Sequence, residues 1–81
     1  MEALDGNAIA GPLMVRFGTE MTAAVGTCRH CGAIEQIAEL RVYAKAPGMV
    51  ARCRVCGSVV IVLIERGDGI RVEFAGFSLN G

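Results

Sequence analysis

Cys28-Arg29-His30-Cys31-Gly32 is one of two five-residue segments of the form C-x2-C-G in this chain, and the other is Cys53-Arg54-Val55-Cys56-Gly57. Together the two segments contain all four cysteines of the protein. A tight turn of this form directs two thiolates to one point, and the glycine supplies the positive φ with which the chain leaves the turn. Two such turns complete the four sulfur ligands of a tetrahedral metal site.

The predicted ligands are Cys28, Cys31, Cys53 and Cys56, and the predicted metal is Zn²⁺, which four thiolates suit well. Rubredoxins hold iron with a similar pair of turns, so an electron-transferring iron centre is the alternative. This chain lacks their usual proline in the second turn and their aromatic-rich core. Four thiolates leave no coordination position open for a catalytic water, which favours a structural metal.

The residues next to the cysteines are rich in positive charge. We expect Arg29, Arg52 and Arg54 to offset the negative charge of the thiolates. His30 lies inside the first turn and could compete as a ligand. Because four cysteines already fill a tetrahedral shell, we expect His30 to face the solvent.

Residues 1–18 are predicted to be an N-terminal helical segment that packs on the sheet, and residues 19–81 the zinc-ribbon domain, within a single domain overall. Asp5 or Asn7 can cap a helix start. An apolar stripe recurs every four residues up to Phe17, and Gly18 can end the helix in a left-handed turn. Because Pro12 interrupts the pattern, we expect either a kinked helix or a short helix from Pro12 to Phe17.

The segment between the two cysteine pairs is predicted to form antiparallel strands. Residues 22–27 lead into the first turn, and residues 36–44 have mostly strand-like alternation, with a helix over residues 33–41 as the alternative. Ala46-Pro47-Gly48 suits a type II turn, after which residues 49–52 return to the second cysteine pair.

The strongest strand signal is the segment from Ser58 to Arg66, whose apolar run Val59–Ile64 predicts a central strand covered on both faces. A hairpin turn is expected at Gly67-Asp68-Gly69. The alternation of apolar and charged residues over 70–74 then predicts a strand with one solvated face. Residues 75–81 give little information.

Size and composition limit the function classes. A chain of 81 residues forms one small domain, which often needs a metal or a partner for stability. With 53% apolar residues, we expect a protein partner or self-association, for example as a homodimer. The first twenty residues have no signal-peptide pattern, and the longest apolar run is too short to cross a bilayer, so we expect a cytoplasmic protein without membrane contact. In that compartment paired cysteines bind metal more often than they oxidise.

No catalytic constellation is recognisable: the chain has no glycine-rich phosphate loop, and its closest acid pair, Glu35 and Glu39, has no adjacent base or nucleophile. We therefore expect no enzyme activity and identify no small-molecule substrate. The net charge of zero gives no general attraction to nucleic acid. A local basic face of Arg41, Lys45, Arg52 and Arg54 could still bind it, although aromatic residues for base stacking are missing there.

Several motifs resemble a family of short, uncharacterised bacterial proteins, a domain of unknown function with a zinc-ribbon appearance. The similar segments are Leu4-Asp5-Gly6-Asn7-Ala8, Ala10-Gly11-Pro12-Leu13, the two cysteine turns, and Leu40-Arg41-Val42-Tyr43. The resemblance implies a ribbon fold with zinc at the four cysteines and carries no known activity. The predicted fold is thus a small, metal-bound, mainly β zinc ribbon (rubredoxin-like) with antiparallel strands and a short N-terminal helical segment.

Overall fold

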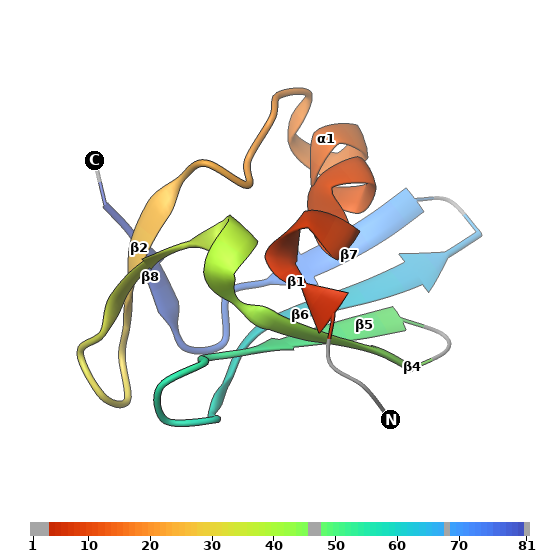
Figure 1. Cartoon of the computed structure of the whole chain (residues 1–81). Coiled ribbons are helices and arrows are strands. Elements are labelled where there is room, and N and C mark those ends of the chain that lie inside the picture. Colours follow the sequence, from red (N-terminus) through yellow and green to blue (C-terminus); the bar gives the residue numbers. More distant parts are fainter. Residues whose placement is uncertain (1–3, 46–47, 68, 81) are drawn as a thin grey trace.

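The computed structural model describes residues 4–45, 48–67 and 69–80, except for the side chain of Lys45. The described chain is mainly β, with antiparallel strands in two sheets and one short α-helix (Figure 1). The first sheet has the strand order β1-β4-β5-β6-β7. Its strands are β1 (Leu4–Asp5), β4 (Arg41–Lys45), β5 (Gly48–Arg52), β6 (Val59–Arg66) and β7 (Gly69–Glu73).

The second sheet has three strands in the order β3-β2-β8. It is formed by β2 (Val25–Cys28), β3 (Ile34–Gln36) and β8 (Phe77–Leu79). Strand β8 was not predicted, and it pairs with β2 in the register Thr27 to Ser78. The short strand β1 was likewise not predicted.

The N-terminal segment begins with a 3-10 turn, η1 (Gly6–Ile9), that continues into α1 (Ala10–Phe17). Asp5 caps η1 by accepting a hydrogen bond from the N–H of Asn7, as predicted. Gly18 ends α1 in the left-handed conformation with φ of 73°, which was also predicted. The helix contacts β7. The boundary expected after residue 18 stays a prediction.

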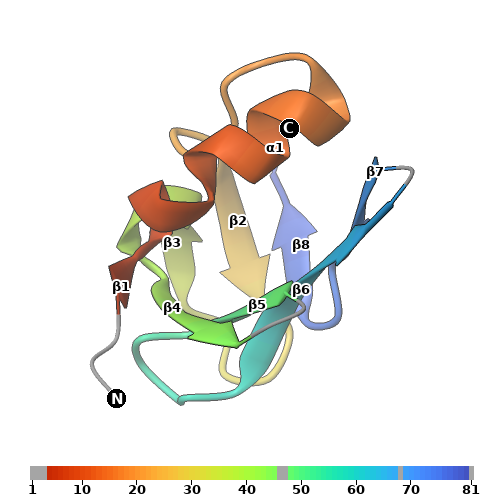
Figure 2. The ribbon, with the colours of Figure 1, turned by 90° about the vertical axis from the view of Figure 1, so that its right-hand side faces the viewer.

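The core lies between the two sheets and beneath the helix. In two views at right angles, α1 and the three-stranded sheet lie on the same side of the five-stranded sheet (Figure 1; Figure 2). The fully buried side chains come from the helical segment, from both sheets and from the connections between them: Ile9, Leu13, Ile37, Leu40, Val42, Val60, Ile61 and Phe77. The packing therefore joins all parts of the described chain into one core.

The predicted strand over residues 36–44 is wrong for residues 37–39. These residues form a 3-10 turn, η2 (Ile37–Glu39), and β4 begins only at Arg41. The carboxylate of Glu39 accepts a hydrogen bond from the N–H of Gln36 at 2.9 Å, which closes a capping box. Ile37 is fully buried, and its N–H donates to the carbonyl of Ala24, so the turn is held by the core rather than by a strand ladder.

Strand β6 is central in its sheet, but the prediction that both of its faces are covered is wrong. Ile61 and Leu63 are buried, whereas Val62 and Ile64 on the opposite face are only half-buried. The other elements of the described chain lie on one side of the sheet (Figure 2), and none of them covers the face that carries Val62 and Ile64. The predicted turns at Ala46-Pro47-Gly48 and Gly67-Asp68-Gly69 include positions 46, 47 and 68, which lie outside the described residues.

Candidate metal centre

The two C-x2-C-G segments have the same backbone geometry. In the first, the N–H of Cys28 donates to the carbonyl of Ala33, and the N–H of Gly32 donates to the carbonyl of Cys28. The second segment repeats both bonds, from Cys53 to Ser58 and from Gly57 to Cys53. Gly32 and Gly57 have φ of 80° and 79°, in the left-handed region that side chains disfavour. The turn geometry and the role of the glycines were therefore predicted correctly.

The fold brings the four predicted cysteines together. Cys28 and Cys31 lie in the hairpin between β2 and β3, and Cys53 and Cys56 lie in the hairpin between β5 and β6. Their sulfur atoms all lie within 4.8 Å of one another, in an arrangement that could hold a metal ion. The four cysteines are free thiols rather than disulfides. The two hairpins belong to different sheets, so the cluster joins the sheets at one end of the core.

The sulfur separations fit a tetrahedral thiolate site. Cys28 and Cys56 have sulfur atoms 3.8 Å apart, and the sulfurs of Cys31 and Cys53 are 3.7 Å apart. A tetrahedron with metal–sulfur bonds of about 2.3 Å has edges of roughly 3.8 Å. The donor set and its spacing therefore fit a closed four-sulfur site, and they do not distinguish zinc from iron.

The four thiols differ in their surroundings. Burial raises the pKa of Cys53 to about 12, although the N–H groups of Cys56 and Val55 oppose this shift. The hydroxyl and the N–H of Ser58 hydrogen-bond to Cys56 and lower its pKa to about 6. Cys28 and Cys53 are buried, whereas Cys31 and Cys56 are exposed. The pKa of the exposed Cys56 thus lies well below that of the buried Cys53.

Two of the basic residues that were predicted to offset the thiolate charge, Arg29 and Arg52, form specific hydrogen bonds. The Nε of Arg29 donates to the hydroxyl of Ser78 at 2.8 Å. Arg52 donates from Nη1 to the carbonyl of Gly57 at 2.8 Å and so supports the second cysteine turn. His30 is exposed, as predicted; it is not part of the described cluster of metal-ligating side chains.

The structure describes the side chains of three residues of the predicted basic face, Arg41, Arg52 and Arg54. Arg54 forms ion pairs with Glu35 and Glu39, at 3.8 Å and 3.4 Å. Arg41 and Arg52 pair in register on β4 and β5 and share the open face of the five-stranded sheet. Lys45 belongs to β4, but its side chain lies outside the described part of the chain.

Glu35 is a buried carboxylate beside the cluster that the sequence analysis did not identify as part of the site. It is only 5% exposed, and its Oε1 lies 3.6 Å from the sulfur of Cys53. Its Oε2 has no hydrogen-bond partner among the described residues and faces only the guanidinium of Arg54. The neighbouring Ile34 is 67% exposed, so the pair reverses the usual burial of apolar and charged residues. Only its nearness to Cys31 in the sequence could have pointed to Glu35.

No helix of the described chain is both long and apolar enough to cross a membrane.

Comparison with known proteins gives one match. Residues 1–80 match the model of a family described as "Family of unknown function (DUF6510)", and the chain belongs to that family. Neither the curated proteins nor the solved structures contain a significant match to the chain.

Proposed function

We propose that this chain, whose family has no assigned function, is a structural zinc-binding domain of the zinc-ribbon type that serves as a protein-interaction or scaffolding module. In this proposal the ligands are Cys28, Cys31, Cys53 and Cys56, and the domain is not an enzyme. The observation that carries the proposal is the position of the four-cysteine cluster, with two cysteines from a hairpin of each sheet.

This position gives a bound metal a clear structural effect. The two hairpins approach each other at one end of the core, and four thiolates that share one ion would fix the three-stranded sheet against the five-stranded sheet. Structural zinc contributes on the order of 10–16 kcal/mol in zinc-finger peptides near neutral pH. That contribution is as large as the whole stability of a typical small domain, which is about 5–15 kcal/mol.

Two further observations support the structural role. A site completed by four sulfurs has no open coordination position for a substrate or a catalytic water. The free thiols of the described cluster also suit a reducing compartment, which supports our proposal of a cytoplasmic location.

Elemental analysis of the protein purified from its own cells tests the identity of the metal. We expect about one zinc per chain and a colourless protein. A rubredoxin-like electron carrier would instead contain iron and show thiolate-to-iron absorption. A chain without any bound metal would contradict the structural proposal.

The interaction role rests on large apolar side chains at the surface. Val15, Ile34 and Val55 are 73%, 67% and 66% exposed. Ile34 follows the first cysteine turn, and Val55 lies within the second. Static light scattering of the zinc-loaded protein over a range of concentrations tests self-association. A rise in mass with concentration supports a homodimer. A mass that stays that of the monomer contradicts self-association and leaves a different protein as the proposed partner.

A further inference from the structure

The open face of the five-stranded sheet has an apolar centre. Paired residues of neighbouring antiparallel strands point to the same face, and the register aligns Tyr43 with Val50 and Val50 with Val62. Ile64 is two residues further along β6 and therefore lies on the same side. All four side chains are half-buried, although no other element of the described chain covers this face (Figure 2).

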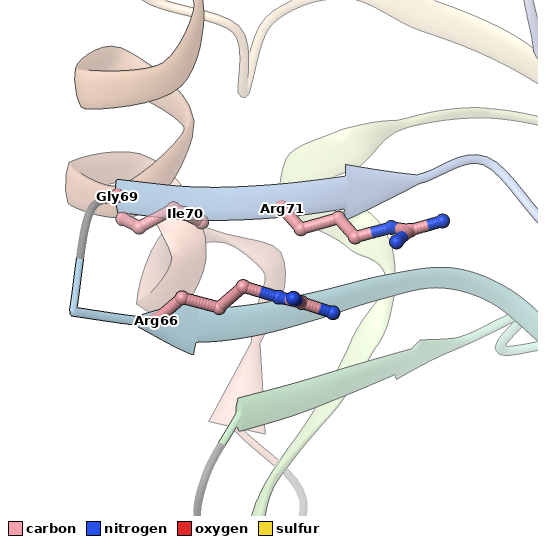
Figure 3. A pocket seen from close by; sticks show the side chains of 4 residues that line it. All are labelled: Arg66, Gly69, Ile70 and Arg71. Atoms are coloured by element: carbon pink, nitrogen blue, oxygen red, sulfur yellow. The ribbon is translucent and has the colours of Figure 1, made fainter.

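Arginines surround this apolar centre at both ends. Arg41 and Arg52 are direct cross-strand partners at one end, on β4 and β5. At the other end, the side chains of Arg66 on β6 and Arg71 on β7 run side by side and line a shallow hollow of about 290 Å³ (Figure 3). Among the residues that the structure describes, these four arginines outnumber the two acids at this face, Asp5 and Glu73.

The described acids at this face lie on the two edge strands of the sheet, β1 and β7. Glu73 forms an ion pair with Arg71 at 2.7 Å, and Asp5 is paired in register with Arg41 on the edge strand β1. Like charges directly opposite each other on neighbouring strands are destabilising, and Arg41 and Arg52 are such a pair. An anionic group between the two guanidinium groups would remove this repulsion.

The spacing of the two arginine pairs defines the ligand. They are separated by five to seven residues along β6, which corresponds to roughly 15–23 Å. The side chains between them are three aliphatic residues and one tyrosine. A matching ligand therefore carries negative charges toward its two ends and apolar side chains between them.

We propose that this face, formed by Tyr43, Val50, Val62, Ile64 and the four arginines Arg41, Arg52, Arg66 and Arg71, docks an acidic amphipathic segment of a partner protein. A helix of about 10–15 residues spans the distance between the arginine pairs. Arginine forks bind carboxylates through two hydrogen bonds, and tyrosine and arginine are enriched at the energetic centres of interfaces. The inference rests on the proposed role of the domain as an interaction module and specifies its partner.

The same observations disfavour two other occupants. A second copy docked face to face would bring the two sets of arginines together, which is unfavourable. Single-stranded nucleic acid binds through aromatic rings on which bases stack. Tyr43 is the only aromatic residue on this face, and its ring already has the guanidinium of Arg52 over it, 6.0 Å from the centroid.

The experiment is an NMR titration of the zinc-loaded full chain labelled with ¹⁵N. The probe is a synthetic peptide of about 14 residues, long enough to span the face as a helix. It has leucines spaced three and four apart and glutamates on both flanks. The control peptide has lysine in place of every glutamate. Oligothymidylate is titrated separately. We expect the acidic peptide alone to shift the amide signals of β4–β7, with binding that weakens as salt increases.

Matched variants locate the binding. The double substitution Arg66→Glu and Arg71→Glu should weaken binding of the acidic peptide about tenfold or more. The double substitution Arg66→Gln and Arg71→Gln removes both charges without reversing them and should weaken peptide binding less. It serves as the control in case the charge-reversed variant misfolds. Arg16→Glu reverses one charge, half the change of the double variant, at an exposed position of α1 on the other side of the sheet, and should change affinity by less than about twofold.

Several outcomes would overturn the inference. These are no shift with the acidic peptide, equal binding of the lysine peptide, stronger binding of oligothymidylate at the same strands, and a dimer formed through this face. The zinc content and signal dispersion of the same samples separate the two proposals. If both are retained while the peptide fails to bind, only the docking proposal is wrong, whereas a folded chain without zinc contradicts the proposed function.

Discussion

Replacement of one exposed ligand, Cys31→Ser, measures how much of the stability depends on the shared metal. The side chain of Cys31 is exposed, so the loss of its sulfur removes little packing, and its sulfur lies 3.7 Å from that of Cys53 in the other hairpin. If four thiolates share the roughly 10–16 kcal/mol that zinc contributes in zinc-finger peptides, each contributes about 2.5–4 kcal/mol. For a domain of this size, 1 kcal/mol changes the melting temperature by about 4–8 °C, so we expect a decrease of at least about 10 °C.

The assay is thermal unfolding followed by circular dichroism, with zinc content determined on the same samples. The matched control is His30→Ala in the same turn, because His30 is exposed and lies outside the cysteine cluster. Its melting temperature should change by no more than about 4 °C, as for an ordinary surface substitution. A chelator should lower the wild-type melting temperature much more than that of Cys31→Ser. If Cys31→Ser unfolds at the wild-type temperature, the reasoning is refuted.

Two further predictions concern charge balance at the cluster and close backbone packing. Arg54→Ala should lower zinc affinity about tenfold in competition with a chelator, because it leaves the carboxylate of Glu35 uncompensated beside a ligand. Adding Glu35→Gln to the Arg54→Ala variant should restore the affinity. If neither change alters the affinity, the ion pair between Arg54 and Glu35 does not affect zinc binding. Gly6→Ala should destabilise the fold by about 1–3 kcal/mol in urea unfolding, because its Cβ would collide with the backbone carbonyl of Ile37. Gly11→Ala in α1 meets no atom and should instead stabilise the chain by about 0.5–1 kcal/mol; equal effects of the two changes would contradict the packing.

The parts of the structure that were predictable from the sequence depend on short-range interactions. Each cysteine turn closes its hydrogen bonds within five residues, and its glycine must adopt positive φ, so motif and geometry correspond directly. The end of α1 at Gly18 and the alternation in β7 follow from equally local rules. These rules were enough to identify the cysteine cluster.

The parts that were missed depend on contacts between distant segments. Strand β8 exists because residues 77–79 pair with β2, and no local pattern in that short segment indicates its partner. The 3-10 turn at residues 37–39 forms because the core takes the side chain of Ile37. In β6, a continuous apolar run suggested burial on both faces, but the pattern does not indicate which elements cover each face, and Val62 and Ile64 are only half-buried.

The burial of Glu35 shows the same limitation at the site. Strand alternation alone would place Ile34 inside and Glu35 outside, and the structure has the reverse. The register of β3 is set by its pairing with β2, in which Glu35 lies opposite Gly26. The side chain then reaches the cysteine cluster and meets Arg54 from the second cysteine turn. The burial of Glu35 therefore depends on the placement of both hairpins and cannot be predicted from the local sequence pattern.

X-ray absorption at the zinc edge, on protein isolated from its own cells, tests the central claim most directly. The account predicts one shell of about four sulfur atoms at about 2.3 Å from zinc. A first shell with nitrogen or oxygen ligands in place of a sulfur, or iron in place of zinc, would contradict it.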